Sequence, residues 1–415
     1  MPSQTQPSLR RETAALRVAL VSEYYYPDIG GMPEHVHQLG RALARCGHQV
    51  TVITTEFPGR VDGPTDVPYE VVRLGRACPP LYANGSLSLS AVGWGLRRRL
   101  QALFRQRRFD VIHVHAPIFP TLALLAISCA PPESALIGTL HTHFVDSSLL
   151  RFFRPALQRY LDALDGLIAV SDTAVDCMRR IGFRLDAEII PNGVDFDSWQ
   201  SGSSHPSLRG DSSLHLLVQA RLEPRNRIET VIAALSALSH DGQRRRVSVL
   251  GEGPRRQELV SLSHRIDAQF PGAVVAARPD YAASADVYSF TADIASHPMS
   301  LIEGMAAGLP VIAHPISGVR ELVSDGKEGL LVPVGDAAAY AQAIRTLDAS
   351  PSLRRQLGDA ARAKVAWLDW RRLVTPIESQ YLRAISSRRA SGRAGSASVW
   401  PARSRWAARP RPRSP

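Results

Sequence analysis

The alternation of helix and strand patterns between residues 300 and 336 constrains the fold of this 415-residue chain more than any other feature. The segment reads SLIEGMAAGLPVIAHPISGVRELVSDGKEGLLVPVGD. Its pattern predicts helices at 300–307 and 319–323 and buried strands from 311 and at 329–333, with a turn at 308–310. Such alternation is typical of a doubly wound α/β sheet, in which ligands bind outside the carboxyl ends of the strands.

Glu303 lies one turn into the first of these helices and has two interpretations. In the first, Ser300 and Glu303 form a capping box, and the glutamate only satisfies backbone N–H groups. In the second, its carboxylate accepts hydrogen bonds from two vicinal hydroxyls, as in ribose recognition by nucleotide-binding folds. The residues alone leave both interpretations open.

A second pattern typical of ligand binding occurs near the start of the chain. Residues 17–22 form a short apolar run, and Gly30 and Gly31 follow it directly before an amphipathic helix pattern. Glycines at this place allow the backbone to approach a phosphate closely, and the helix N-terminus adds positive potential. By itself, a pair of glycines is also consistent with an ordinary turn.

Two further strands end in side chains suited to a ligand site. Residues 135–141 form a buried strand that ends at His141, at the edge where parallel sheets carry catalytic groups. Residues 214–220 form another strand, and Arg221 follows it immediately, where a guanidinium can bind a diphosphate. His113 lies within an apolar strand and is interpreted as structural.

Taken together, residues 17–385 resemble glycosyltransferase family 4, with motifs in both halves in the expected order. The resemblance implies the GT-B fold: two doubly wound Rossmann-like α/β domains that face a cleft, with a C-terminal helix that crosses back to the first domain. We expect an acceptor-side domain at 17–195, a nucleotide-sugar-binding domain at 196–370 and the crossover helix at 371–386. Residues 1–16 and the basic tail 387–415 are expected to be disordered.

The resemblance also assigns roles to residues in this sequence. Glu303 matches the second glutamate of the family's E-x7-E motif, which holds the nucleotide ribose, and His141 matches the histidine at the donor sugar. The expected catalytic residues are His141 and Arg221. The expected donor-binding residues are Gly30, Gly31, Arg221, Arg225, Asn226, Met299, Ser300 and Glu303.

Two positions depart from the family pattern. Asn226 replaces a lysine that binds the donor phosphates, so that Arg225 or Arg227 has to supply the missing charge. Ala295 replaces the first glutamate of E-x7-E, which removes a contact to the donor sugar and leaves no obvious protein nucleophile. Both departures favour an alternative function, a catalytically impaired glycosyltransferase-like binding or scaffold protein.

The leading hypothesis is a retaining glycosyltransferase that moves a sugar from a nucleotide-diphosphate sugar to an acceptor. The N-terminal run resembles the branches that add mannose or N-acetylglucosamine to phosphatidylinositol, which implies a membrane lipid, while glycan and small-molecule acceptors stay open. The resemblance implies no metal and no other cofactor. Asp195 and Asp197 lie two residues apart in a polar linker, and we interpret them as turn formers.

Charge and apolar content suggest where such a protein works. The formal net charge is +11, but eight arginines beyond residue 387 carry most of the excess, so nucleic acid is not an expected partner. A helix at 96–104 is basic and amphipathic, which fits either an anionic membrane surface or a solvated helix that covers the sheet. Without a membrane span, a secretion signal or paired cysteines, we expect a cytoplasmic protein, at most peripheral on the inner membrane face.

Overall fold

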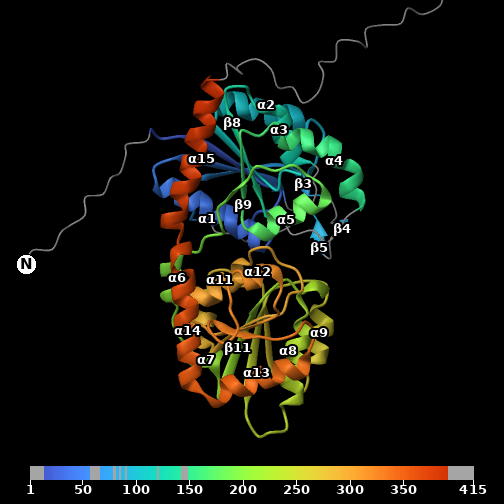
Figure 1. Ribbon diagram of the computed structural model, residues 1–415, viewed down its shortest axis with the longest axis vertical. Coiled ribbons are helices and arrows are strands. Elements are labelled where there is room, and N and C mark those ends of the chain that lie inside the picture. Colours follow the sequence, from blue (N-terminus) through green and yellow to red (C-terminus); the bar gives the residue numbers. More distant parts are fainter. Residues whose placement is uncertain are drawn as a thin grey trace, which may run out of the picture.

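The computed structural model describes residues 14–56, 66–77, 81–83, 86–88, 91–118, 121–141 and 148–390. They form two lobes, each built around one sheet with helices packed on it (Figure 1). His143 and most of the segments expected to be disordered, 1–13 and 391–415, lie outside the described residues.

The first lobe contains an eight-stranded sheet in the order β10-β9-β8-β7-β1-β2-β3-β6. Its neighbouring strands are parallel except for the antiparallel pair β3 and β6. The strands are β1 (Arg17–Val21), β2 (Gln49–Glu56), β3 (Glu70–Ala77), β6 (Ala91–Val92), β7 (Val111–His115), β8 (Ala135–Leu140), β9 (Gly166–Ala169) and β10 (Glu188–Ile189). The other elements are the hairpin β4 (Leu81–Ala83) and β5 (Ser86–Ser88) and the helices α1 (Gly31–Arg45), α2 (Leu96–Arg107), α3 (Leu122–Cys129), α4 (Ser148–Leu161) and α5 (Asp172–Ile181).

Strand residues of this sheet alternate between two separate apolar clusters, as the period of two in a strand requires. In β1, Val18 and Leu20 pack with the apolar face of α1, whereas Ala19 and Val21 pack with α2 and α3 on the opposite face. Both faces of the sheet are therefore covered by helices, which explains why its strands are almost continuously apolar.

The second lobe repeats this design around a six-stranded parallel sheet in the order β13-β12-β11-β14-β15-β16. The strands are β11 (Leu214–Gln219), β12 (Arg245–Leu250), β13 (Asp267–Gly272), β14 (Val287–Phe290), β15 (Val311–Ala313) and β16 (Gly329–Leu331). The α-helices are α6 (Phe196–Gln200), α7 (Pro206–Arg209), α8 (Ile228–Ala237), α9 (Arg256–Leu262), α10 (Arg278–Ser284), α11 (Met299–Ala306), α12 (Ser317–Arg320), α13 (Ala337–Ala349) and α14 (Pro351–Val365). Two short 3₁₀ turns are η1 (Pro224–Asn226) and η2 (Ala366–Leu368). The helix and strand order expected for residues 300–336 is confirmed, with element ends shifted by three residues at most.

The last helix, α15 (Trp370–Ala390), returns to the first lobe, where it contacts α1, β8 and β9 (Figure 1). Tyr381, fully buried, donates or accepts a 2.7 Å hydrogen bond with His113 of β7, and Glu378 lies 2.7 Å from His48. The helix runs to Ala390, four residues into the segment that the sequence assigned to the tail, and Arg388 in this last turn lies 2.6 Å from Asp165. The predicted crossover helix is therefore present and longer than expected.

The basic helix expected at 96–104 is α2, and its apolar side is used inside the first lobe. Leu96, Leu100 and Phe104 are buried in the cluster that covers the sheet, while Trp94 just before the helix is fully exposed. The structure thus favours the interpretation in which this helix covers the sheet. Within the described ranges, no helix is long and apolar enough to cross a bilayer.

Candidate active site

A cleft of about 730 Å³ lies between the two lobes and contains every site residue predicted from the sequence. The first lobe contributes Gly30, Gly31 and His141. The second lobe contributes Arg221, Arg225, Asn226, Met299, Ser300 and Glu303. Residues from strands and helices far apart in the sequence thus meet at one site, at the carboxyl ends of both sheets, as expected for doubly wound folds.

Two helices begin at the cleft. Helix α1 starts at Gly31 with Gly30 before it, and α11 starts at Met299 with Pro298 before it. The first N–H groups of each helix have no acceptor within the helix, so both N-termini can bind an anion. A Cβ added at Gly30 would lie 3.4 Å from the guanidinium nitrogens of Arg221, so glycine lets this arginine pass close to the backbone.

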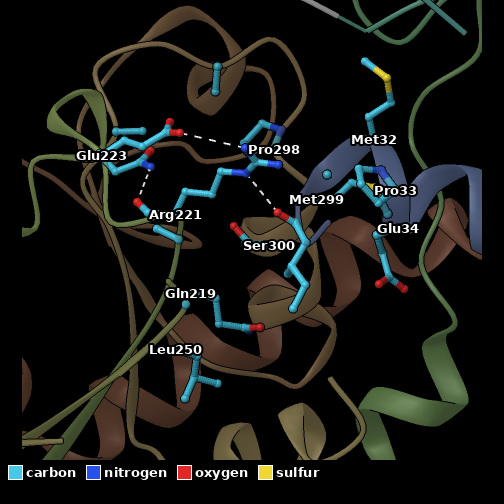
Figure 2. A pocket seen from close by; sticks show the side chains of 18 of the residues that line it. Met32, Pro33, Glu34, Gln219, Arg221, Glu223, Leu250, Pro298, Met299 and Ser300 are labelled. Atoms are coloured by element: carbon cyan, nitrogen blue, oxygen red, sulfur yellow. Dashed lines mark hydrogen bonds and ion pairs between the residues drawn. The ribbon is translucent and has the colours of Figure 1, made fainter. Parts of the chain in front are cut away.

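Arg221 extends from the second lobe across the cleft to the first. Its Nε donates to the carbonyl of Ile29 at 2.9 Å, and a terminal nitrogen donates to Asp28 at 2.5 Å. Glu223 lies 3.9 Å away on its own lobe (Figure 2). A donor diphosphate at this arginine would therefore replace carboxylate and carbonyl partners.

The residues after Arg221 differ in their position relative to the cleft. Asn226 donates from its amide to the Arg221 carbonyl at 2.6 Å, so it supports the loop and brings no charge. Arg225 lines the cleft, with its Nε 3.3 Å from Glu223. Arg227 does not line the cleft and pairs with Asp293 at 3.0 Å. Of the two arginines proposed to supply the charge, only Arg225 is placed for it.

Glu303 is buried and takes part in an ion-pair network that connects the lobes. Arg278, the first residue of α10, donates to both Glu303 oxygens at 3.2 and 3.3 Å. Its other terminal nitrogen donates to Glu34 of α1 at 2.7 Å, and Tyr26 donates to the same carboxylate at 2.5 Å. No side chain caps α11, so the capping-box interpretation of Ser300 and Glu303 is wrong.

The two carboxylates share one guanidinium, and their pKa values move apart. Burial raises the pKa of Glu303 to about 8, because Arg278 offsets only part of the desolvation. Burial also acts on Glu34, but Arg278 and the Tyr26 hydroxyl outweigh it and lower the pKa of Glu34 to about 2. The network therefore favours the ionised form of Glu34 more strongly than that of Glu303.

Sequence reasoning missed Arg278 and Glu34 altogether. They lie 244 residues apart, and each occurs in an ordinary helical segment with no motif around it. Only the closure of one lobe on the other brings them together.

His141 comes directly after β8 and belongs to a group of histidines. Its Nε2 lies 3.0 Å from Nδ1 of His115, and its ring centroid lies 4.5 Å from that of His35. Burial lowers the pKa of His141 well below the usual range, so the ring is neutral at pH 7. His113 bonds to Tyr381 and Thr139 with its two ring nitrogens, in agreement with a structural role.

Asp195 and Asp197 are paired with arginines. Asp195 lies 3.8 Å from Arg41 and 3.9 Å from Arg45, and both oxygens of Asp197 bond to Arg371. These contacts fit the interpretation of a structural linker.

Comparisons with known proteins agree with this architecture. Residues 29–198 match the family model Glycosyltransferase Family 4, and residues 213–349 match the model Glycosyl transferases group 1. The chain is 31% identical to a phosphatidyl-myo-inositol mannosyltransferase of Mycobacterium leprae, over 91% of this chain and 98% of that protein.

Solved structures share the fold. Sucrose-phosphate synthase from Thermosynechococcus elongatus superposes with a TM-score of 0.69 at 22% identity, covering 90% of this chain and 100% of that one. Anabaena HepE, in complex with UDP and glucose, superposes with a TM-score of 0.67 at 18% identity, covering 88% and 98%.

Fold, cleft and these matches together define a glycosyltransferase with the GT-B arrangement predicted from the sequence. The chain belongs to glycosyltransferase family 4.

Proposed function

We propose that this glycosyltransferase is a retaining enzyme that transfers a sugar from a nucleotide-diphosphate sugar to a lipid acceptor such as phosphatidylinositol. The observation that carries the proposal is the meeting of Glu303, Arg221 and two helix N-termini at one cleft. A carboxylate suits the ribose hydroxyls, and the arginine and the helix ends suit the diphosphate.

In this proposal the chain stabilises the leaving group. As the bond between the anomeric carbon and the phosphate oxygen breaks, negative charge grows on the diphosphate. In the proposal, that charge is stabilised by Arg221, Arg225 and the N–H groups at Met299 and Ser300, which line the cleft. The acceptor hydroxyl attacks from the same face and passes its proton to the leaving phosphate oxygen, so that no protein nucleophile and no metal is needed.

Lobe closure has a role in the same mechanism. Arg221 contacts Asp28 and Arg278 contacts Glu34 across the cleft, so the described conformation is closed. Donor entry requires these contacts to open, and closure afterwards excludes water that would hydrolyse the donor.

The lipid acceptor is supported by the mannosyltransferase relative and by the surface of the first lobe. Arg97, Arg98 and Arg99 of α2 are exposed beside Trp94, and α4 exposes Phe152 and Phe153. Arginines attract anionic headgroups, and aromatic rings favour the membrane interface. Because the apolar side of α2 is buried in the lobe, we propose peripheral contact at the inner membrane face through these exposed groups.

The second candidate function is a catalytically impaired binding or scaffold protein. Ala295 and Asn226 favour it, because they remove one carboxylate and one positive charge from the donor site. The carboxylates that pair with Arg221 and Arg278 also favour this function, since they leave less unpaired positive charge for a diphosphate.

A panel of UDP-, GDP- and ADP-sugars separates the two functions. The full chain is incubated with each donor and with phosphatidylinositol vesicles or soluble acceptors, and products are identified by mass spectrometry and their anomeric configuration by NMR. We expect one donor to give a product with retained configuration, and we expect His141→Ala to reduce turnover more than nucleotide affinity. Nucleotide binding without transfer or hydrolysis of any donor would favour the scaffold.

A further inference from the structure

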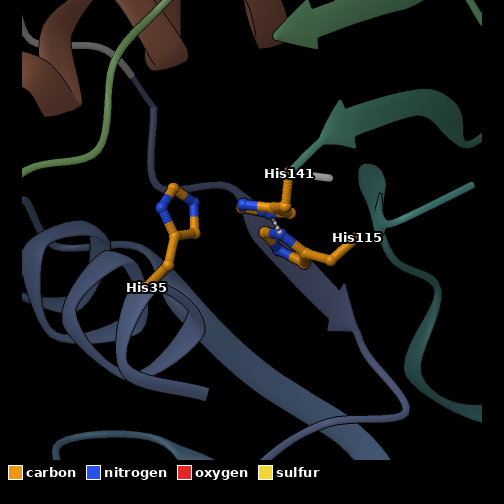
Figure 3. Close-up of side chains that lie close together, drawn as sticks. All are labelled: His35, His115 and His141. Carbon is orange, nitrogen blue, oxygen red and sulfur yellow. Dashed lines mark hydrogen bonds between the residues drawn. The ribbon is translucent and has the colours of Figure 1, made fainter. Parts of the chain in front are cut away.

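Three imidazole rings meet on the side of the cleft formed by the first lobe. His35 lies on α1, His115 ends β7 and His141 follows β8 (Figure 3). One ring nitrogen from each of the three lies within 4.8 Å of the others. His35 and His115 are buried, whereas His141 borders the cleft, so an ion could enter from that side.

Hydrogen bonds fix the protonation of His35. The Asn192 amide nitrogen donates to the His297 carbonyl at 2.7 Å, so its oxygen is the atom that faces His35 Nδ1 at 2.9 Å. His35 therefore carries its proton on Nδ1, and its Nε2 offers a lone pair. Figure 3 shows a ring nitrogen of His35 directed toward His141.

His115 is the least satisfied ring of the group. Its Nδ1 contacts His141, but its Nε2 is buried and has no hydrogen-bond partner among the residues that the structure describes. The atom of His115 that faces the group is Nδ1, which lies 3.0 Å from Nε2 of His141 and would be the metal ligand.

We propose that His35, His115 and His141 bind a divalent transition-metal ion such as Zn²⁺. Zinc–nitrogen bonds of about 2.1 Å in a tetrahedral site place ligand nitrogens roughly 3.3 Å apart. The 3.0 Å separation of His115 and His141 is already close to that value, and the third nitrogen needs to move by about 1.5 Å at most.

The ligand set explains the choice of metal. Three neutral imidazoles without a carboxylate suit Zn²⁺ and its neighbours in the first transition row, whereas Mg²⁺ and Ca²⁺ require oxygen ligands. Asn192 would orient His35 from behind, as partners of metal-bound histidines commonly do. A water molecule would complete the tetrahedral coordination.

Such an ion would bind a ring nitrogen of His141, which would then be unable to act on the donor sugar, and so it would inhibit sugar transfer. This consequence rests on the proposed function, whereas metal binding itself does not. A zinc-binding measurement can therefore succeed or fail independently of any transferase assay.

The test titrates the metal-free full chain with Zn²⁺ in competition with a chromophoric chelator. We expect one equivalent to bind with a dissociation constant of about 1 μM or tighter. His115→Asn should weaken binding by roughly tenfold or more, because one of three ligands is lost. His264→Asn is the matched control, since this exposed histidine lies on the second lobe, and it should leave the affinity unchanged.

Because His115 is buried, its substitution could unfold the chain, so thermal melting without zinc is used to show that each variant is folded. His141→Asn removes a second ligand, one that borders the cleft. Crystals of the unchanged protein soaked in Zn²⁺ give a test that needs no variant. An anomalous peak about 2.1 Å from the three ring nitrogens would support the site. A peak elsewhere, no peak, or unchanged zinc affinity in a folded His115 or His141 variant would overturn it.

Discussion

Arg278→Gln is the substitution whose effect follows most directly from the structure. Arg278 is the shared cation of two carboxylates, Glu34 and Glu303, whose side chains are only 7% and 4% exposed. Removal of one partner from a buried ion pair typically destabilises a protein by about 3–5 kcal/mol, because a charge is left without compensation in a poorly solvated place. We expect a loss of that size at pH 7, and a smaller loss at pH 5, where the carboxylates are more easily protonated.

Urea unfolding of the full chain, followed by circular dichroism, measures this loss. Arg255→Gln is the matched control, because Arg255 is 17% exposed against 16% for Arg278 and also pairs with two glutamates. Its partners Glu229 and Glu258 are 35% and 53% exposed, so water can solvate them once the arginine is gone. Adding Glu34→Gln to Arg278→Gln should restore part of the stability.

The reasoning is refuted if Arg278→Gln is no more destabilising than Arg255→Gln, or if Glu34→Gln lowers stability further in the Arg278→Gln background. Either result would mean that the network contributes little to holding the lobes together.

Three further predictions concern the donor side of the cleft. Glu303→Gln should weaken nucleotide binding by roughly tenfold in calorimetric titrations above pH 8, where Glu303 is ionised and a hydrogen bond to a charged acceptor contributes about 1.5–3 kcal/mol, and by less at pH 7. Equal affinity above pH 8 would remove Glu303 from the ribose site. Folding raises the pKa of Glu303 from 4.5 to about 8, so its contribution to stability is complete below pH 4.5 and is lost as the pH rises through 8. Glu303→Gln should therefore make the free energy of unfolding less dependent on pH between 4.5 and 8. Asn226→Lys should tighten nucleotide-diphosphate binding by about tenfold through a charge-assisted contact. A weaker affinity would show that the hydrogen bond from the Asn226 amide to the Arg221 carbonyl contributes more to donor binding than the added charge.

The sequence was sufficient to predict the elements whose formation depends on local pattern. Residues 300–336 alternate because their apolar residues recur at helix and strand spacing, and that spacing survives in α11, β15, α12 and β16. The resemblance to a family then placed residues from both halves at one cleft, since parallel strands present their carboxyl ends on one side.

Features that depend on tertiary packing could not be predicted in this way. Ser300 and Glu303 have the spacing of a capping box, but the helix begins one residue earlier and Arg278 takes up the carboxylate. Helix α2 has the sequence of a membrane-binding helix, but its apolar side covers the sheet. Spacing along the chain does not show which partner a side chain finds in the folded protein.

The group of histidines shows the same limit. His115 and His141 both occur at the end of a strand, and only the resemblance to the family singled out His141, whereas His35 lies within the amphipathic segment that forms α1. Their proximity is visible only once α1 packs beside β7 and β8.

A crystal structure of the full chain with a nucleotide-diphosphate sugar tests the central claim most directly. We expect the ribose hydroxyls within hydrogen-bonding distance of Glu303 and the diphosphate between Arg221 and the N-terminus of α11. A nucleotide bound outside the cleft, or one whose ribose faces away from Glu303, would contradict the account.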